Sequence, residues 1–294
     1  AKADTTGVFQ LESGGMRRYL KQLKATEFED ITAMVSLFRP GPMEWIPDYI
    51  KRKNGKAKVK YIHDDLKTIL KPTYGIGIYQ EQILEIARMF ADFSLGEADL
   101  LRRAIGKKIK KELNAQREKF IKGAVGKGYD EKLAIKIFDD VILPFAGYGF
   151  NKSHGACYAQ IAYETAYLKA HYPTEFMAAM LSADSGNTER VTLEISECRT
   201  MGIEVLPPDI NESDSDFTPL PDKKIRFGLT AIKGVGESSV QSVMEIREET
   251  GKFESIEDFA GRIPSKLLNK KLLEAMAKAG ALDCFGERTV FVEN

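Results

Sequence analysis

One stretch of the sequence, LTAIKGVGESSVQSV at residues 229–243, is typical of a short helix, a glycine turn and a second helix. Gly234 and Gly236 permit a tight turn, because glycine adopts backbone angles that other residues avoid. The amide groups of such a turn point outward as an anion-binding nest, and the second helix adds its positive end. Val235 between the glycines is expected to fix the turn in the core of the helix pair.

This pattern predicts a helix-hairpin-helix motif, which grips one nucleic-acid backbone without reading bases. The predicted DNA-binding residues of the hairpin are Lys233, Gly234, Val235 and Gly236. A packing unit that binds no DNA is the alternative, since degenerate copies of a motif can serve that role. Residues 266–281, rich in leucine, are expected to form the partner helices of a tandem arrangement, although this second copy lacks a clean Gly-x-Gly.

The composition is that of a folded protein with one large or two ordinary domains. Of its 294 residues, 43% are hydrophobic and 29% are charged. Basic and acidic residues both number 43, so net charge alone indicates no polyanionic partner. Three scattered cysteines argue against a disulfide framework and favour a reducing, cytoplasmic compartment. No apolar run approaches the roughly 18 residues that span a bilayer, so we expect a soluble chain without membrane contact.

Apolar residues recur at helical spacing through most of the chain, whereas strand signals are few and short. The clearest helical faces lie at residues 83–90, 113–124, 133–141 and 191–198. The three strand signals lie at residues 74–79, 203–206 and 224–229. We therefore predict a mainly α fold, in which a multi-helical domain precedes a small helical domain with tandem helix-hairpin-helix elements and a few short strands.

Charge is segregated along the chain although its total is zero. Residues 99–127 hold ten basic and three acidic side chains, whereas residues 184–222 hold ten acidic and two basic. The stretch 207–221, rich in Pro, Asp and Ser, marks the expected domain connection. The predicted parts are a domain at residues 1–183, an acidic connecting segment at 184–225 and the helix-hairpin-helix region at 226–294. Because the first residue is not Met, we expect a piece of a longer polypeptide.

The run LRRAIGKK at residues 101–108 places four cations around a helix end that we predict at Gly106. These cations are Arg102, Arg103, Lys107 and Lys108. One interpretation is a polyphosphate clamp, because Arg pairs phosphate oxygens two at a time and Lys supplies a mobile point charge. The other is that the cations only complement the negative end of the helix dipole.

The run FAGYGFNKSHGA at residues 145–156 combines glycines, aromatic rings and hydrogen-bond donors at a predicted helix start. Rings and cations together suit a nucleobase and its phosphates. The candidate nucleotide-binding residues are Tyr148, Asn151, Lys152 and His154. Asn151 or Ser153 is also expected to cap the helix, and a cap leaves anion binding at the helix start possible. No further ligand accompanies His154 and Cys157 at a recognisable spacing, so we predict no metal site.

The sequence FRPGP at residues 38–42 predicts a rigid turn. Arg39 is expected to have an extended backbone conformation there, because a residue before Pro avoids the helical region. We predict Arg39 as a further DNA contact. Simple punctuation between two helices is the alternative interpretation.

Together these motifs resemble the C-family of bacterial replicative DNA polymerases, the family of the DNA polymerase III alpha subunit. The resemblance covers essentially the whole chain. It rests on residues 5–13, 37–42, 79–82, 101–108, 145–154 and 231–236. It implies that residues 1–183 form the fingers domain of a polymerase, and that the helix-hairpin-helix region begins after the acidic segment.

In this family the fingers hold the incoming deoxynucleoside triphosphate. The resemblance implies that Arg102 and Arg103 contact the triphosphate, with Lys107 and Lys108 beside them. It also places the signature residues Tyr148, Asn151, Lys152 and His154 next to the nucleotide. Gln82 lies in a further matching motif.

The resemblance also implies parts outside this chain. Family chemistry uses two Mg²⁺ ions held by palm aspartates, which precede residue 1 in the family order, so no cofactor is expected here. We expect a part of a DNA-directed DNA polymerase that binds primer-template DNA and dNTP alongside other domains, but is inactive alone. Sliding-clamp and clamp-loader contacts are expected in absent segments. The alternative is a non-enzymatic, sequence-independent DNA-binding module or a replisome interaction platform.

Overall fold

The structure, a computed structural model, describes residues 2–107, 110–145 and 148–292. The chain divides into two compact units, unit 1 at residues 1–166 and unit 2 at residues 167–294. Helices supply nearly all of the regular structure, and the strands of the described residues form one small sheet, so the predicted mainly α class is confirmed. The domain boundaries expected at residues 183 and 225 stay predictions.

The regular structure of unit 1 is helical in its described residues, apart from one isolated bridge. Its elements are α1 (Gly14–Leu23), α2 (Phe28–Leu37), η1 (Pro42–Trp45), α3 (Ile46–Lys53), α4 (Asp65–Leu70), η2 (Lys71–Thr73), α5 (Gln80–Ala91), α6 (Leu95–Lys107), α7 (Lys110–Gly126), α8 (Glu131–Ile137), the π-helix η3 (Phe138–Ile142), α9 (Leu143–Phe145) and most of α10 (Lys152–His171).

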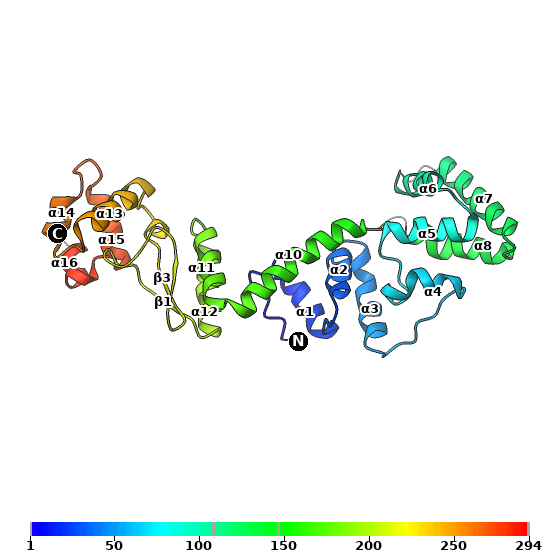
Figure 1. Ribbon diagram of the computed structural model, residues 1–294, viewed down its shortest axis with the longest axis horizontal. Helices are drawn as coiled ribbons and strands as arrows, with labels where there is room; N and C mark the ends of the chain where they lie inside the picture. The colour runs from blue at the N-terminus through cyan, green and yellow to red at the C-terminus, as the bar shows by residue number, and fades with distance from the viewer. Residues whose placement is uncertain (1, 108–109, 146–147, 293–294) are drawn as a thin grey trace. The chain divides into compact units, whose positions relative to one another are not determined.

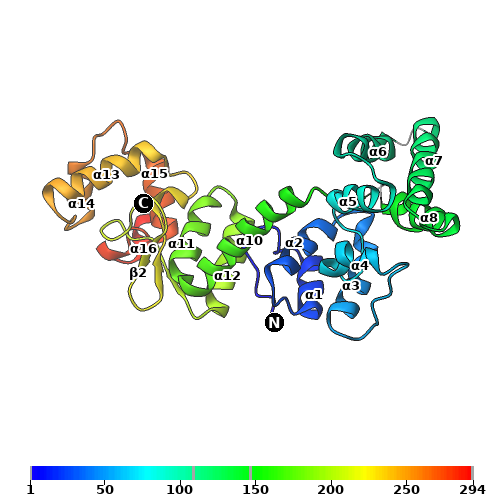
Figure 2. The same cartoon turned by 45° about the vertical axis from the view of Figure 1, so that its right-hand side comes forward.

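Two hydrophobic cores hold unit 1 together. Ile83, Ala87 and Phe90 share the buried face of α5, as their spacing predicts, and pack in a core with α4, α6, α7 and α8. A second core lies among α1, α2 and α3 and includes Met34 and Tyr49. Figure 1 and Figure 2 show α5 to α8 gathered together, apart from α1 to α3. Tyr148 lies on one of the segments between these cores, whereas Arg102 and Arg103 lie on α6, which packs in the first core.

One such segment, residues 74–79, is not the strand that its sequence predicts. Tyr74 and Gly75 have positive φ angles of 51° and 77°, which break the extended run. Only Tyr79 pairs in strand fashion, as an isolated parallel bridge with Phe150. The prediction was wrong because alternating apolar residues suit any chain that passes between two cores.

Buried Gln82 fixes this segment to α5. Its Oε1 accepts hydrogen bonds from the amides of Ile78 and Tyr79, at 2.8 and 2.9 Å. Its Nε2 donates to the hydroxyl of Thr73 at 2.9 Å and to the carbonyl of Ile69 at 3.3 Å. Gln82, which the family resemblance singled out, therefore connects backbone to backbone inside unit 1.

Unit 2 combines helices with a small three-stranded sheet. Its elements after α10 are α11 (Pro173–Ala183), α12 (Thr188–Thr200), β1 (Glu204–Leu206), β2 (Thr218–Leu220), β3 (Lys224–Arg226), η4 (Leu229–Ala231), α13 (Glu237–Thr250), α14 (Ile256–Arg262), α15 (Lys270–Ala279), η5 (Asp283–Phe285) and α16 (Arg288–Val292). The strand order is β1-β3-β2, with β1 parallel and β2 antiparallel to the central β3.

The strands expected at 203–206 and 224–229 are present in shortened form as β1 and β3. Leu229 belongs instead to the short helix η4. Strand β2 was not predicted, because it is only three residues long and contains Pro219, which removes a backbone donor. The sheet and helices α11 and α12 share one core, and α13, α14 and α15 share another.

Candidate functional site

Helix α6 carries two of the predicted phosphate ligands, Arg102 and Arg103, near its end. Nε and Nη2 of Arg102 donate to Oδ1 of Asp99 at 2.9 and 2.7 Å, and Nε of Arg103 donates to Oδ2 at 2.8 Å. The hydrogen bond from Arg102 is the largest cause of the lowered pKa of Asp99. Because two guanidinium groups share one carboxylate, the cluster keeps a net positive charge.

The expected helix end at Gly106 is wrong. Helix α6 continues to Lys107, and Gly106 does not have the positive φ of a helix-terminating glycine. Ala104 and Ile105 are buried, so packing keeps the last turn of α6 helical and the helix does not end at Gly106. The side chain of Lys107 and the whole of Lys108 lie outside the described residues.

Gln80, the first residue of α5, joins Arg102 to the glycine-aromatic run that precedes α10. Its Oε1 accepts a hydrogen bond from Nη1 of Arg102 at 3.3 Å. Its Nε2 donates to the carbonyl of Gly149 at 3.1 Å, and its amide donates to the carbonyl of Phe150 at 2.8 Å. One side chain thus contacts both candidate motifs of unit 1.

The start of α10 is capped, and a carboxylate already lies there. Oδ1 of Asn151 accepts a hydrogen bond from the amide of His154 at 2.8 Å, so Asn151 is the capping residue. Its Nδ2 donates to Oε1 of Glu81 at 3.1 Å, and the amide of Lys152 donates to both Glu81 oxygens at 3.0 and 3.1 Å. Glu81 therefore satisfies the positive end of the helix in this structure.

Aromatic rings surround the cations at this helix start. The ring of exposed His154 lies between Phe150 and Tyr158, with centroid separations of 5.4 and 4.2 Å. Nζ of exposed Lys152 lies 5.6 Å from the centroid of the Tyr79 ring. Such an arrangement presents ring faces and positive charge on one surface.

Arg39 reaches the same run from the end of α2. Its Nη2 donates to the carbonyl of Tyr148, its Nε donates to the carbonyl of Ser36 at 3.0 Å, and its guanidinium carbon lies 4.7 Å from the ring centroid of Phe150. Burial lowers the pKa of Arg39. A Cβ on Gly155 would lie 2.7 Å from Oγ of Ser36, so glycine permits the close approach of α10 to α2.

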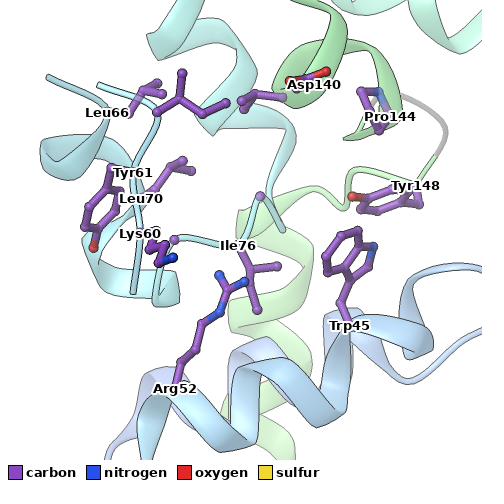
Figure 3. A pocket seen from close by; sticks show the side chains of 14 residues that line it. Trp45, Arg52, Lys60, Tyr61, Leu66, Leu70, Ile76, Asp140, Pro144 and Tyr148 are labelled. Atoms are coloured by element: carbon purple, nitrogen blue, oxygen red, sulfur yellow. The ribbon is translucent and has the colours of Figure 1, made fainter. Parts of the chain in front are cut away.

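Tyr148 is half-buried and lines a pocket. It lines this pocket beside Trp45 (Figure 3). Burial, together with the nearby charge of Glu44, raises the pKa of Tyr148 to about 12. Tyr148 is therefore more enclosed than Asn151, Lys152 and His154, which are exposed.

In unit 2, η4 and α13 flank the predicted hairpin. Val235 is buried, while Lys233, Gly234 and Gly236 are exposed, as the motif predicts. Gly234 has a φ of 95°, which strains any other residue type. Gly236 is the N-cap residue of α13, whose first amides have no acceptor within the helix.

Residues 266–281 contain one helix, α15, and not the pair of partner helices expected there. A Cβ on Gly234 would lie 3.7 Å from Cβ of Ala275 and 3.9 Å from Cε of Lys271, so α15 packs behind the hairpin turn. Its residues Leu272 and Met276 share a core with the hairpin. An exposed lysine of α15 is therefore close to the hairpin glycine.

Sequence reasoning missed Gln80, Glu81 and Asp99 as parts of the site. Asp99 stands three and four residues before the two arginines, a spacing that places them on one helix face and could have revealed the pairing. Gln80 and Glu81 carry no such local signal, because their partners lie 69 and 70 residues away.

Two general features complete this part of the structure. Within residues 2–107, 110–145 and 148–292, no group of three or more His, Cys, Asp or Glu side chains is arranged to hold a metal ion. In the same residues, no helix combines the length and the apolar character that crossing a membrane requires.

Comparison with known families gives two matches in this chain. The model of the bacterial DNA polymerase III alpha subunit finger domain matches residues 1–128, which include Arg39, Gln80 and both arginines of α6. The model of a helix-hairpin-helix motif matches residues 202–290, which include the hairpin and α15.

Among curated proteins, the chain is similar to DNA polymerase III subunit alpha from several bacteria. It is 50% identical to the protein from Thermus aquaticus, with 98% of this chain and 24% of that protein covered. It is 50% identical to the protein from Pseudomonas aeruginosa, with 97% of this chain and 25% of that protein covered. It is 48% identical to the protein from Bacillus subtilis, with 98% of this chain and 26% of that protein covered. The chain spans about a quarter of the length of these relatives. It therefore belongs to the bacterial DNA polymerase III alpha-subunit family, and corresponds to a portion that contains fingers and helix-hairpin-helix sequences.

Proposed function

We propose that this chain forms the nucleotide-binding fingers and a DNA-gripping region of a DNA-directed DNA polymerase. The observation that carries the proposal is the double contact of Gln80, which hydrogen-bonds to Arg102 and to Gly149. This contact supports a single binding surface, on which the cations of α6 and the start of α10 act on one phosphorylated monomer.

Arg102 and Arg103 are the proposed triphosphate ligands. A guanidinium group pairs phosphate oxygens through two parallel donors. The side chain of Arg103 is 63% exposed, against 33% for Arg102, so Arg103 is the more accessible to a ligand. Lys107 and Lys108 are proposed to add positive charge beyond them.

The start of α10 is proposed to bind the remainder of the nucleotide. Lys152 and His154 are exposed on its first turn, and Asn151 fixes that turn by capping. Tyr148 is proposed to support the nucleotide from the enclosed side. Arg39, fixed against Phe150, stays a proposed DNA contact next to this surface.

The hairpin is proposed to hold duplex DNA through its backbone. The amides around Gly234 and Gly236 and the lysines Lys233 and Lys271 suit phosphate oxygens, and Val235 holds the turn in the core. Binding through phosphates is indifferent to base sequence and weakens as salt rises.

Catalysis itself is assigned to parts of the subunit outside this chain. The described residues offer no ligand cluster for Mg²⁺, so the metal that activates the reacting groups is proposed to be held by palm carboxylates elsewhere. This chain alone is then expected to bind dNTP and DNA without incorporating nucleotides. Sliding clamp, clamp loader and the other domains are proposed partners of the whole subunit in the cytoplasm.

The test uses Arg103→Ala and His154→Ala in the intact polymerase. We expect kcat/KM for nucleotide incorporation to fall by about 100-fold in each, as when an oriented donor to developing charge is removed, while primer-template affinity stays nearly constant. Lys132→Ala removes an exposed cation of α8 as a control. An equal loss of DNA affinity in both variants would favour a non-enzymatic DNA-binding module.

A further inference from the structure

A pocket of about 390 Å³ lies between the two hydrophobic cores of unit 1 (Figure 3). Leu66 and Leu70 of the first core and Ile76 of the second core line it. Its volume falls within the range of about 300 to 1,000 Å³ that is common for small-ligand sites. Apart from Tyr148, its lining has no part in the function proposed above.

Three of the fourteen residues that line the pocket are aromatic. Trp45 and Tyr148 lie close to one another on one side, and Tyr61 lies on the other side (Figure 3). Flat rings that face a pocket suit a flat partner, and every nucleobase has a flat face that can stack on such a ring.

Positive charge leads into the pocket along residues 51–60, here named the basic loop. This segment, KRKNGKAKVK, holds six basic residues and no acidic one. Lys53 is engaged in a buried ion pair with Asp30, at 2.7 Å. Arg52 and Lys60 line the pocket itself.

The other lysines of the basic loop face solvent. Lys51, Lys56, Lys58 and Lys60 are exposed, and none of the four has an acidic partner in the described part of the chain. Uncompensated cations at the protein surface attract a polyanion over roughly 8 to 10 Å at physiological salt.

Asp140 places a negative charge on one wall of the pocket, so its two sides differ in charge. Its exposed carboxylate lies on the wall beside Pro144 and Tyr148, away from Lys60 (Figure 3). A carboxylate repels phosphate but accepts hydrogen bonds from the amino or imino group of a base. The occupant that fits therefore has an anionic backbone toward Arg52 and Lys60, and a flat, hydrogen-bond-donating ring toward Asp140.

We propose that this pocket binds one unpaired base of single-stranded DNA, with the sugar-phosphate backbone held along the basic loop. Stacking rings beside a positively charged track are the two elements of sequence-tolerant single-strand binding. The choice of DNA rests on the polymerase function proposed above. The pocket itself requires no contact with a nucleoside triphosphate.

The sole tryptophan of the chain reports on this pocket, because Trp45 lines it. The experiment titrates the 294-residue chain with an oligothymidylate of about eight nucleotides, and with a strand of equal length that carries abasic sites throughout. Anisotropy of a label on each strand reports binding, and tryptophan emission reports stacking. We expect the thymidylate to quench Trp45, and the abasic strand to bind more weakly and leave the emission unchanged.

Charge reversal supplies a matched pair of variants. Lys60→Glu is expected to weaken thymidylate binding by about tenfold, whereas Lys132→Glu, which changes the net charge equally on α8, changes it by less than about twofold. The proposal is overturned if thymidylate binds without quenching, if the abasic strand quenches equally, or if both variants weaken binding alike. No dNTP is present in this measurement, so its failure and a failure of the Arg103 and His154 test remain distinguishable.

Discussion

The candidate sites of unit 1 and unit 2 offer positive charge to phosphate in different ways. In unit 1, Gln80 of α5 accepts a hydrogen bond from Arg102 of α6, and the neighbouring Glu81 accepts one from Asn151, which precedes α10. In unit 2, residues 233–236 form one continuous stretch in which Lys233, Gly234 and Gly236 are exposed. A site of the first kind depends on tertiary structure, whereas one of the second kind depends on the local conformation of a few residues.

The largest effect should come from breaking the tertiary support of unit 1. Asp30 is buried and accepts hydrogen bonds from the amides of Thr26 and Glu27. It also forms an ion pair with Lys53. Asp30→Ala leaves a buried cation and two amides unpaired, so we expect the free energy of unfolding of unit 1 to fall by about 3 to 5 kcal/mol. Urea unfolding measures this change.

The control for Asp30 is Asp64→Ala, since Asp64 is exposed, and it should change stability by less than about 0.5 kcal/mol. Duplex binding by the hairpin should survive Asp30→Ala, because the hairpin belongs to unit 2. A parallel loss of duplex binding would show that the two sites do not differ in the way described.

The next effect concerns the two hairpin glycines, which the motif treats alike but the structure does not. Gly234→Glu places a side chain at a φ of 95° and a negative charge in the nest, so duplex binding should weaken by about 1 to 3 kcal/mol. Gly236→Ser should fold normally, because a Cβ there meets nothing within 4 Å and serine is a favourable N-cap residue. Salt-dependent DNA titrations compare them. Unchanged binding by a folded Gly234→Glu would make the motif a packing unit.

A smaller effect should follow from removing the side-chain bridge of unit 1. Gln80→Ala deletes the contacts with Arg102 and Gly149, so nucleotide affinity should fall by about 0.5 to 1.5 kcal/mol, with duplex binding unchanged. Gln160→Ala, at an exposed position on α10, is the control. If Gln80→Ala and the control bind nucleotide equally, the two motifs of unit 1 do not form one surface.

The smallest effect concerns pH and the start of α6. A hydrogen bond from Lys119, followed by those from Ser94, lowers the pKa of the Glu97 carboxyl to about 2. Because this pKa lies below the unfolded value of about 4.3, the stabilisation is present above pH 4.3 and is lost as pH falls toward 2. Glu97→Gln should flatten the dependence of Tm on pH in this acid window. An unaltered profile would contradict the assignment.

The hairpin turn was predictable because most of its causes are local. The exposure of its glycines and the start of α13 follow from residues within one short stretch, whereas the core that buries Val235 also includes residues of α14 and α15. The helical face of α5 was predictable for a similar reason, since a buried stripe leaves its period in the sequence. The signals that failed, at 74–79 and at Gly106, are those in which packing overrides a local preference.

The cations of unit 1 were predictable as residue types, but their anionic partners were not. Arg102, Arg103 and Lys152 follow from composition and family resemblance. The carboxylate of Glu81 lies at the start of α10 only because the chain returns there after 70 residues. A single sequence carries no periodic or spacing signal for a contact of that length.

Gln82 has a chemical consequence for the evolution of this protein. The oxygen of its side-chain amide accepts hydrogen bonds from two N–H groups, and the nitrogen donates hydrogen bonds to two oxygens. Glutamate has the same shape but would direct lone pairs at the oxygens of Thr73 and Ile69, and methionine would strand the two N–H groups. No other side chain among the twenty amino acids makes the same four hydrogen bonds. A substitution at this position is therefore expected to require simultaneous changes in its neighbours.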